Sequence, residues 1–139
     1  MNYRLSFETR LQYDNGKAGI GLPVSLHWNG KAVDLEAKLG TGASDCIFER
    51  GHGAALGLTI ENGQRRRFGT ATGWFEAYGH RLLLKVEERE LEIIAWFAGE
   101  SRFNRNGLGR TGFIYRVLIG LNDYEGRLYL GSVEAEAED

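Results

Sequence analysis

The chain reads Leu39-Gly40-Thr41-Gly42-Ala43-Ser44 at the point where a run of alternating residues stops. In that run, which covers residues 32–39, every second side chain from Val33 onward is apolar, a pattern that predicts a β-strand. Two glycines within three residues predict a tight turn directly after the strand, because glycine adopts backbone conformations that other residues avoid. The sequence therefore places a turn of small residues at a strand end, where a sheet can hold it rigidly.

Short strands separated by turns continue on the N-terminal side of this turn. Residues 20–28 alternate in the same way, and Asn29-Gly30 follows them as a strong hairpin signal, because both central positions of such a turn favour positive φ. Residues 3–8 also alternate between apolar and polar side chains and predict a further strand, which we expect to continue through residues 11–13.

The C-terminal side is also rich in short apolar runs. Cys46-Ile47-Phe48 predicts a short strand, and residues 49–58 hold enough helix formers for one turn of helix. Further strands are predicted over 68–78, 82–86, 91–97 and 127–130, and a second helix over 113–119. We therefore expect a mainly-β chain with seven to nine short strands and one or two short helices. It forms one domain over residues 1–131, followed by an acidic tail over 132–139 that we expect to be disordered.

Composition argues against several classes of protein. A formal net charge of −2 is not that of a nucleic-acid-binding protein with a basic face, and we expect Arg65-Arg66-Arg67 to be a solvated loop or strand edge. Cys46 is the single cysteine, so no disulfide can form within the chain, and we expect a buried small hydrophobe there. The N-terminus opens no apolar signal segment and no run reaches transmembrane length. We expect a soluble, cytoplasmic protein with no membrane partner.

No pattern in the sequence points to a metal or a cofactor. His27, His52 and His80 are isolated and lack the spacing of a metal site. Gly40-Thr41-Gly42 begins like a dinucleotide-binding glycine motif, but Asp45 stands where the third glycine belongs and no long helix follows. We therefore expect neither a metal nor a cofactor.

One residue separates the turn from a known active-site motif. With Asp in place of Gly40, residues 39–44 would read Leu-Asp-Thr-Gly-Ala-Ser, the active-site turn of the aspartic peptidases. Later segments are similar, in the same order, to segments of the retropepsin-like aspartic protease family: Ala54-Ala55-Leu56-Gly57-Leu58, a flap-like hairpin over 68–82, the run 106–113, and a closing hairpin over 119–131. In the run 106–113, Gly107 replaces the usual apolar residue of the family.

The resemblance implies a closed β-barrel of the acid-protease type, with one or two short helices, assembled as a homodimer. In such proteases two Asp side chains, one from each subunit, share a proton and activate the water that attacks the peptide bond. Gly40 stands at the position of that Asp, so the resemblance implies an endopeptidase site that is inactive as written. The implied partners are a second copy of the chain and an extended peptide or protein substrate, with no nucleic acid.

The resemblance also implies roles for the residues after Gly40. Thr41 would tie the two turns together across the dimer axis, and Gly42 would let the substrate backbone approach closely. The residues expected to bind substrate follow the turn or lie near the flap tip: Ala43, Ser44, Asp45, Thr70, Ala71, Thr72, Gly73 and Trp74. We further expect Arg110 to pair with Asp45.

Three functions remain open at the level of sequence. The first is an aspartic endopeptidase that lacks its catalytic carboxylate. The second is a non-catalytic dimer that uses the retained cleft and flap to bind an extended peptide as an added strand. The third is a dimerisation module without a ligand. Asp and Gly codons differ by one base, so the sequence is compatible with a natural or an engineered Gly40.

Overall fold

The computed structural model describes residues 1–133, and within them it contains ten β-strands, one α-helix and two 3₁₀ turns. The strands are β1 (Thr9–Gln12), β2 (Gly21–Trp28), β3 (Lys31–Leu39), β4 (Ile47–Phe48), β5 (Gln64–Thr70), β6 (Gly73–Val86), β7 (Arg89–Ala98), β8 (Gly107–Leu108), β9 (Leu118–Asn122) and β10 (Arg127–Gly131). The helical elements are α1 (Arg50–Ala55), η1 (Ile60–Asn62) and η2 (Ile114–Arg116). The protein is mainly β, as the alternation predicts. Most of the acidic tail, residues 134–139, lies outside the described residues.

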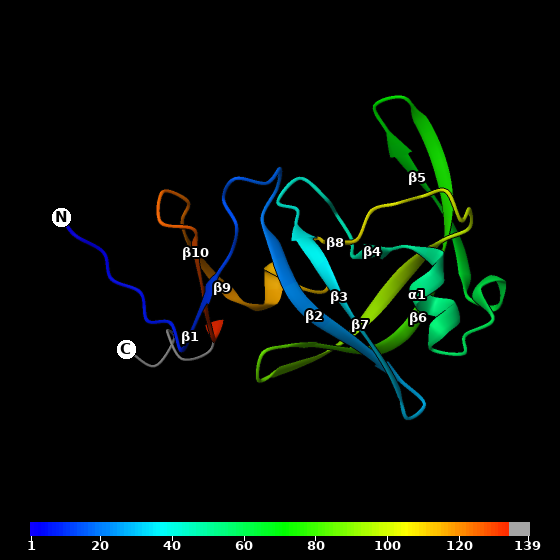
Figure 1. The fold of residues 1–139 in the computed structure, drawn as a ribbon, viewed down its shortest axis with the longest axis horizontal. Helices are drawn as coiled ribbons and strands as arrows, with labels where there is room; N and C mark the ends of the chain where they lie inside the picture. Colours follow the sequence, from blue (N-terminus) through cyan, green and yellow to red (C-terminus); the bar gives the residue numbers. More distant parts are fainter. Residues whose placement is uncertain (134–139) are drawn as a thin grey trace.

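The strands form two sheets: the smaller lies at the left of Figure 1, and the larger extends from the centre of the view to the right. The smaller sheet has the order β1-β10-β9 and lies at the same end as the N-terminus. The larger sheet has the order β2-β3-β8-β4-β7-β6-β5. Its first strand, β2, also pairs with β6, so the strands from β2 to β6 form a continuous ring of pairings. This leaves β5 as an edge strand, and the β5–β6 hairpin (green in Figure 1) projects beyond the rest of the sheet.

The main hydrophobic core takes side chains from both sheets. Phe48, Phe97 and Phe113 are among its largest fully buried side chains, and Leu128 joins the smaller sheet to it. A second, smaller cluster joins strands β5, β6 and β7 through Phe68, Ala77 and Trp96. The two clusters hold the hairpin base and the central strands in fixed positions, because closely packed side chains tolerate little displacement.

The strand predicted over residues 3–8 is wrong. Residues 1–7 have no regular structure, and β1 begins at Thr9. Tyr3 is 85% exposed and Leu5 is 50% exposed, so the alternation at this end has no core to face. An alternating pattern predicts a strand only where one face becomes buried.

The break predicted between residues 78 and 82 is also wrong, because β6 runs through Gly79 and His80 without interruption. A Cβ on Gly79 would lie 2.9 Å from Ile94 and 3.0 Å from Trp96 on the neighbouring strand. Glycine in a strand interior can mark a close approach of a neighbour instead of a strand end. That is its role here.

The helix predicted over 113–119 is wrong in length and in part of its type: only the single 3₁₀ turn η2 forms, and residues from Leu118 onward form β9. Gly112 has φ +105, a conformation that an α-helix does not use. Leu118 pairs with Gly131 of β10, which extends the smaller sheet. Helix and strand periodicities are hard to separate in a short apolar run. In residues 113–119, the pairing with β10 decides the structure of the C-terminal end.

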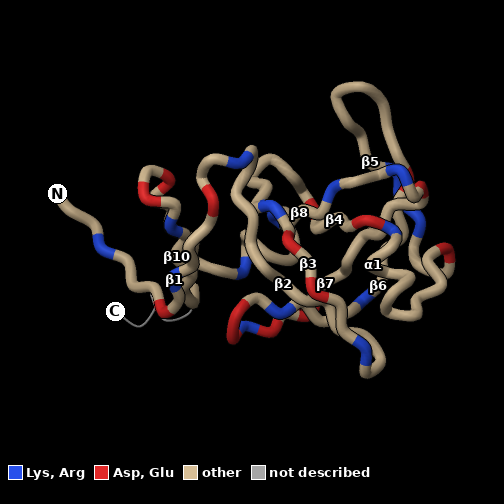
Figure 2. The backbone as a smooth tube through the Cα atoms, in the orientation of Figure 1, with Lys and Arg blue, Asp and Glu red and all other residues tan. Residues whose placement is uncertain are grey.

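Charged side chains of both signs are interspersed along the chain in Figure 2. Arg65, Arg66 and Arg67 lie on the edge strand β5, which confirms the strand-edge alternative for this cluster. Arg66 is nevertheless more than a solvated side chain, because it contacts the turn after β3, as described below.

Candidate functional site

The turn at residues 40–45 connects the end of β3 to β4 and is fixed by backbone hydrogen bonds. The N–H of Gly40 donates to the carbonyl of Leu108 at 2.9 Å, and the N–H of Ala43 donates to the carbonyl of Gly40 at 3.0 Å. Thr41 and Gly42 are exposed at the outer side of this turn. The structure therefore presents the small residues of the motif at a surface.

The segment after β8 holds the turn from behind. The N–H groups of Arg110 and Thr111 donate to the carbonyls of Ala43 and Ser44 at 2.9 and 2.8 Å. A Cβ on Gly109 would lie 2.2 Å from the backbone oxygen of Asp45, so only glycine fits at that position. The two segments are locked together through their backbones.

The backbone does not require glycine at position 40. The positive-φ residues of the described chain do not include Gly40. A Cβ there would lie 3.3 Å from the Cβ of Ala43 and 3.7 Å from the carbonyl oxygen of Leu108. A Cβ at this position therefore needs a shift of only a few tenths of an ångström in Ala43.

Asp45 is the one buried acidic side chain of the turn. Its Oδ2 accepts a hydrogen bond from the Ser44 hydroxyl at 2.8 Å and from Nη2 of Arg66 at 2.5 Å. The carboxylate side chain is 9% exposed, whereas the Arg66 side chain is 44% exposed. This ion pair connects the turn directly to the edge strand of the hairpin.

The predicted pair between Arg110 and Asp45 is wrong for the described chain, because Arg66 takes that place. Arg66 shares one face of β5 with the buried Phe68, two residues away, since side chains alternate along a strand. Its guanidinium lies 4.4 Å from the Phe68 ring centroid and 4.7 Å from that of Trp96. The two-residue spacing between Arg66 and Phe68, which places both side chains on one face of the strand, was the sequence signal that could have predicted this contact.

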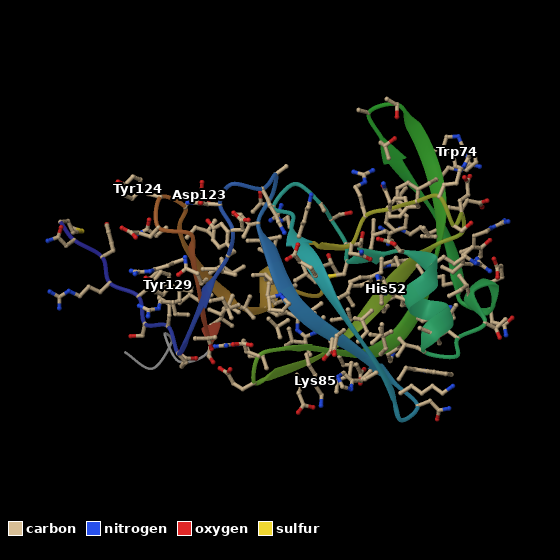
Figure 3. The ribbon with its side chains drawn as sticks, viewed as in Figure 1. His52, Trp74, Lys85, Asp123, Tyr124 and Tyr129 are labelled. Carbon is tan, nitrogen blue, oxygen red and sulfur yellow. The ribbon has the colours of Figure 1, made fainter. Side chains whose placement is uncertain are left out.

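The β5–β6 hairpin and the 40–45 turn line one cavity and are joined by the Arg66–Asp45 ion pair. Thr70 pairs with Gly73, so Ala71 and Thr72 form the tip, and Gly73 has φ +154. Trp74 is 56% exposed and stands on the hairpin away from the core (Figure 3), with the Arg67 guanidinium 3.8 Å from its ring centroid.

A cavity of about 430 Å³ lies between the turn and the hairpin. We call it the cleft. Of the predicted substrate-binding residues, the cleft brings together Ala43, Ser44, Asp45, Thr70 and Ala71, with Gly42 beside them. Thr72, Gly73 and Trp74 do not line it. Its size is within the range of small-ligand and peptide side-chain sites.

The sequence-based prediction did not name seven residues that line the cleft: Ile47, Phe68, Gly69, Phe75, Phe103, Arg105 and Gly107. The rings of Phe75 and Phe103 lie 4.7 Å apart, and the Arg105 guanidinium lies 5.5 Å from the Phe103 centroid. Phe103 follows β7 in a segment without regular structure, where an aromatic residue among polar neighbours was the available signal.

Cys46 follows the turn and is fully buried, as predicted. Burial raises the pKa of its thiol to about 11. The sulfur lies 3.6 Å from the carbonyl oxygen of Thr111. A buried, protonated thiol is a poor nucleophile, so Cys46 contributes packing and not covalent chemistry.

Within the described residues, two kinds of feature are absent: a metal-binding cluster and a membrane-spanning helix. Within residues 1–133, no group of three His, Cys, Asp or Glu side chains is placed to hold a metal ion. Over the same residues, no helix has the length and apolar character needed to cross a membrane.

Comparison with solved structures supports the fold, whereas two other comparisons found no match. No protein-family model matches the chain, and no curated protein matches it significantly. Among solved structures, a retropepsin-like aspartic protease from Rickettsia conorii matches with a TM-score of 0.63 and 19% identity, over 88% of this chain and 97% of that chain. EIAV protease in complex with the inhibitor HBY-793 matches with a TM-score of 0.51 and 20% identity, over 79% and 88%. The chain has the retropepsin-like fold, as the resemblance implies.

Proposed function

We propose that this chain, whose fold is that of the retropepsin-like aspartic proteases, is a homodimeric peptide-binding domain of the aspartic endopeptidase type that lacks its catalytic carboxylate. The observation that carries the proposal is the cleft, which lies between residues 42–45 of the turn and the hairpin; Gly40 and Thr41 precede these residues in the turn and do not line the cleft themselves. An extended peptide in this position would run past the turn, where an aspartic peptidase presents its carboxylates.

The chemistry of the proposed family explains why Gly40 matters. Two carboxylates a few ångströms apart share one proton, so that one acts as general base on water while the other polarises the scissile carbonyl. Each copy of this chain contributes one such turn, so a dyad requires two copies. With glycine at position 40, a symmetric dimer has neither carboxylate.

No neighbouring acid replaces the missing group. Asp34 and Glu36 are exposed along β3, ahead of the turn. Asp45 is already bonded to Ser44 and Arg66. We therefore propose that the chain as written hydrolyses no peptide bond at any pH.

Restoring the carboxylate tests the proposal directly. Gly40→Asp is expected to create peptidase activity, because the backbone at this position accepts a side chain. Activity should fall as pH rises through the upper of the two coupled pKa values of the dyad, since the dyad works only while it holds one proton. Gly40→Asn is the matched control: it has nearly the same shape but cannot ionise, and it should be inactive.

The dimer is tested in the same preparations. Activity of Gly40→Asp should depend on protein concentration near the dimer dissociation constant, and sedimentation of the unmodified chain should give twice the 15.6 kDa monomer mass. Activity of the unmodified chain after repurification would contradict the role proposed for position 40. A monomer at micromolar concentration would contradict the dimer.

A second candidate is peptide binding without catalysis as the native role. The cleft favours it, because Phe75 and Phe103 present aromatic rings to the cleft, where apolar side chains of a peptide can pack. A folded, dimeric Gly40→Asp variant that binds a broad peptide library but cleaves none of it would favour this candidate. A chain that binds no peptide at all would leave only a dimerisation module.

A further inference from the structure

A second and larger cavity, of about 740 Å³, is also lined by Asp45. We call it the arginine hollow. Its walls come from β6, β7 and the segment 110–116, and it shares Ser44 and Asp45 with the cleft. The arginine hollow and the cleft are therefore neighbours on the surface, with the Arg66–Asp45 ion pair at their boundary.

Four arginines line the hollow, and two of them have acidic partners. Arg66 pairs with Asp45 at 2.5 Å, and Arg81 pairs with Glu92 at 2.9 Å. These two pairs use both acidic residues of the hollow.

The other two arginines, Arg110 and Arg116, make no ion pair within residues 1–133. Nη1 of Arg116 donates to the carbonyl of Glu92 at 2.6 Å, a contact that orients the guanidinium without neutralising it. The hollow therefore carries an excess positive charge, although the whole chain has a net charge of −2. Guanidinium groups bind carboxylates well, because their paired N–H donors match the two carboxylate oxygens.

The hollow is also partly apolar. Ile94 is 40% exposed and Tyr115 is 85% exposed, and both belong to its lining. A ligand that suits this surface has a carboxylate for the free guanidinium groups and an apolar group for the neighbouring side chains.

We propose that the arginine hollow binds an acidic side chain, with an apolar residue beside it, on the part of a peptide that extends past Asp45 out of the cleft. This inference rests on the proposed peptide-binding function and names its substrate class: peptides with Asp or Glu beyond the segment held in the cleft. The adjacency of the two cavities, which share Ser44 and Asp45 in their linings, favours a peptide over a free anion.

Matched peptide pools test the inference on the full chain. Synthetic, end-capped, fluorescently labelled nonapeptide pools carry either Glu or Gln at one fixed position and mixed residues elsewhere, and the fixed position is moved along the peptide. We expect the Glu pool to bind about 3- to 10-fold more tightly than the Gln pool at one end of the peptide, measured by fluorescence polarisation. The preference should decrease as salt rises from 50 to 500 mM, because salt screens a partly exposed charge pair.

Arginine variants locate the preference. The double variant Arg110→Gln/Arg116→Gln should abolish it, whereas Arg10→Gln should keep it. Arg10 is exposed on β1 and does not line the hollow, so Arg10→Gln is the charge-matched control for the single variants Arg110→Gln and Arg116→Gln, each of which should reduce the preference. A preference that survives in the double variant would overturn the inference.

The outcomes separate this inference from the proposed function. Equal binding of the Glu and Gln pools, both by the full chain and by a chain that ends at Val133, would overturn the inference and leave peptide binding intact, whereas no binding of any pool would overturn both. Residues 134–139 are themselves acidic, so the titration is repeated on a chain that ends at Val133. A Glu preference that emerges only in this shorter chain supports the site and identifies the chain's own acidic residues as its competitor.

Discussion

Arg66 connects the hairpin to the candidate site, and its removal should weaken the whole domain. Breaking a buried ion pair on one side costs about 3–5 kcal/mol, because a charge is left without a partner. The Arg66 side chain is 44% exposed, so we discount this cost for solvent screening to about 1–2 kcal/mol. Loss of its contacts with the rings of Phe68 and Trp96 adds about 0.5 kcal/mol each. Arg66→Ala should therefore lower the free energy of unfolding by about 2–3 kcal/mol.

Urea unfolding at a fixed protein concentration measures this cost, since the stability of a dimer depends on concentration. Arg65→Ala is the matched control: its side chain is 70% exposed and lies 3.4 Å from Glu76, and it should cost less than about 0.5 kcal/mol. A cycle with Asp45→Asn should show a coupling of about 1 kcal/mol or more. Equal costs for Arg66→Ala and Arg65→Ala would refute the structural role assigned to Arg66.

Two further predictions concern the interior around the turn. Burial raises the pKa of Cys46 to about 11, so the folded protein should resist maleimide at pH 8 and react faster as the pH rises toward 11. Denaturant should expose the thiol at once. Rapid labelling of the folded chain at pH 8 would contradict the burial of Cys46. Gly109→Ala should cost more than about 3 kcal/mol in urea unfolding or prevent folding, since its Cβ meets a backbone oxygen at 2.2 Å. Gly69→Ala, with nothing within 4 Å, should change stability by less than about 1 kcal/mol, and similar effects of the two substitutions would contradict the close packing at Gly109.

The β2–β3 hairpin could be predicted from the sequence, because local patterns specify it. Alternation over 20–28 and 32–39, joined by Asn29-Gly30, predicted β2, β3 and their turn, and the structure has all three. In these segments the chemistry of adjacent residues decides the conformation, because the side-chain period and the turn residues agree with each other. The position of the Gly40 turn at a strand end follows from the same local signals.

What the sequence did not specify depends on distant partners. Residues 113–119 were predicted as a helix, but β10 pairs with their last two residues, Leu118 and Ile119, which belong to β9. Asp45 was assigned to Arg110, which is close in the family motif, yet Arg66 reaches it from another strand. Phe103 lines the cleft from a segment without regular structure, so no periodic pattern marked it. In each case a tertiary contact, and not a local preference, made the choice.

The backbone lock between the 40–45 turn and the segment after β8 has a kinetic consequence. It joins parts of the chain that are far apart in sequence: Cys46 and Thr111, which meet behind the turn, are separated by 65 residues. Closing so long a loop costs entropy before any of the lock's hydrogen bonds can form, and chains dominated by such non-local contacts fold slowly. The candidate site should therefore be absent from nascent chains until β8 has left the ribosome, and any peptide-binding property would arise only with the complete fold.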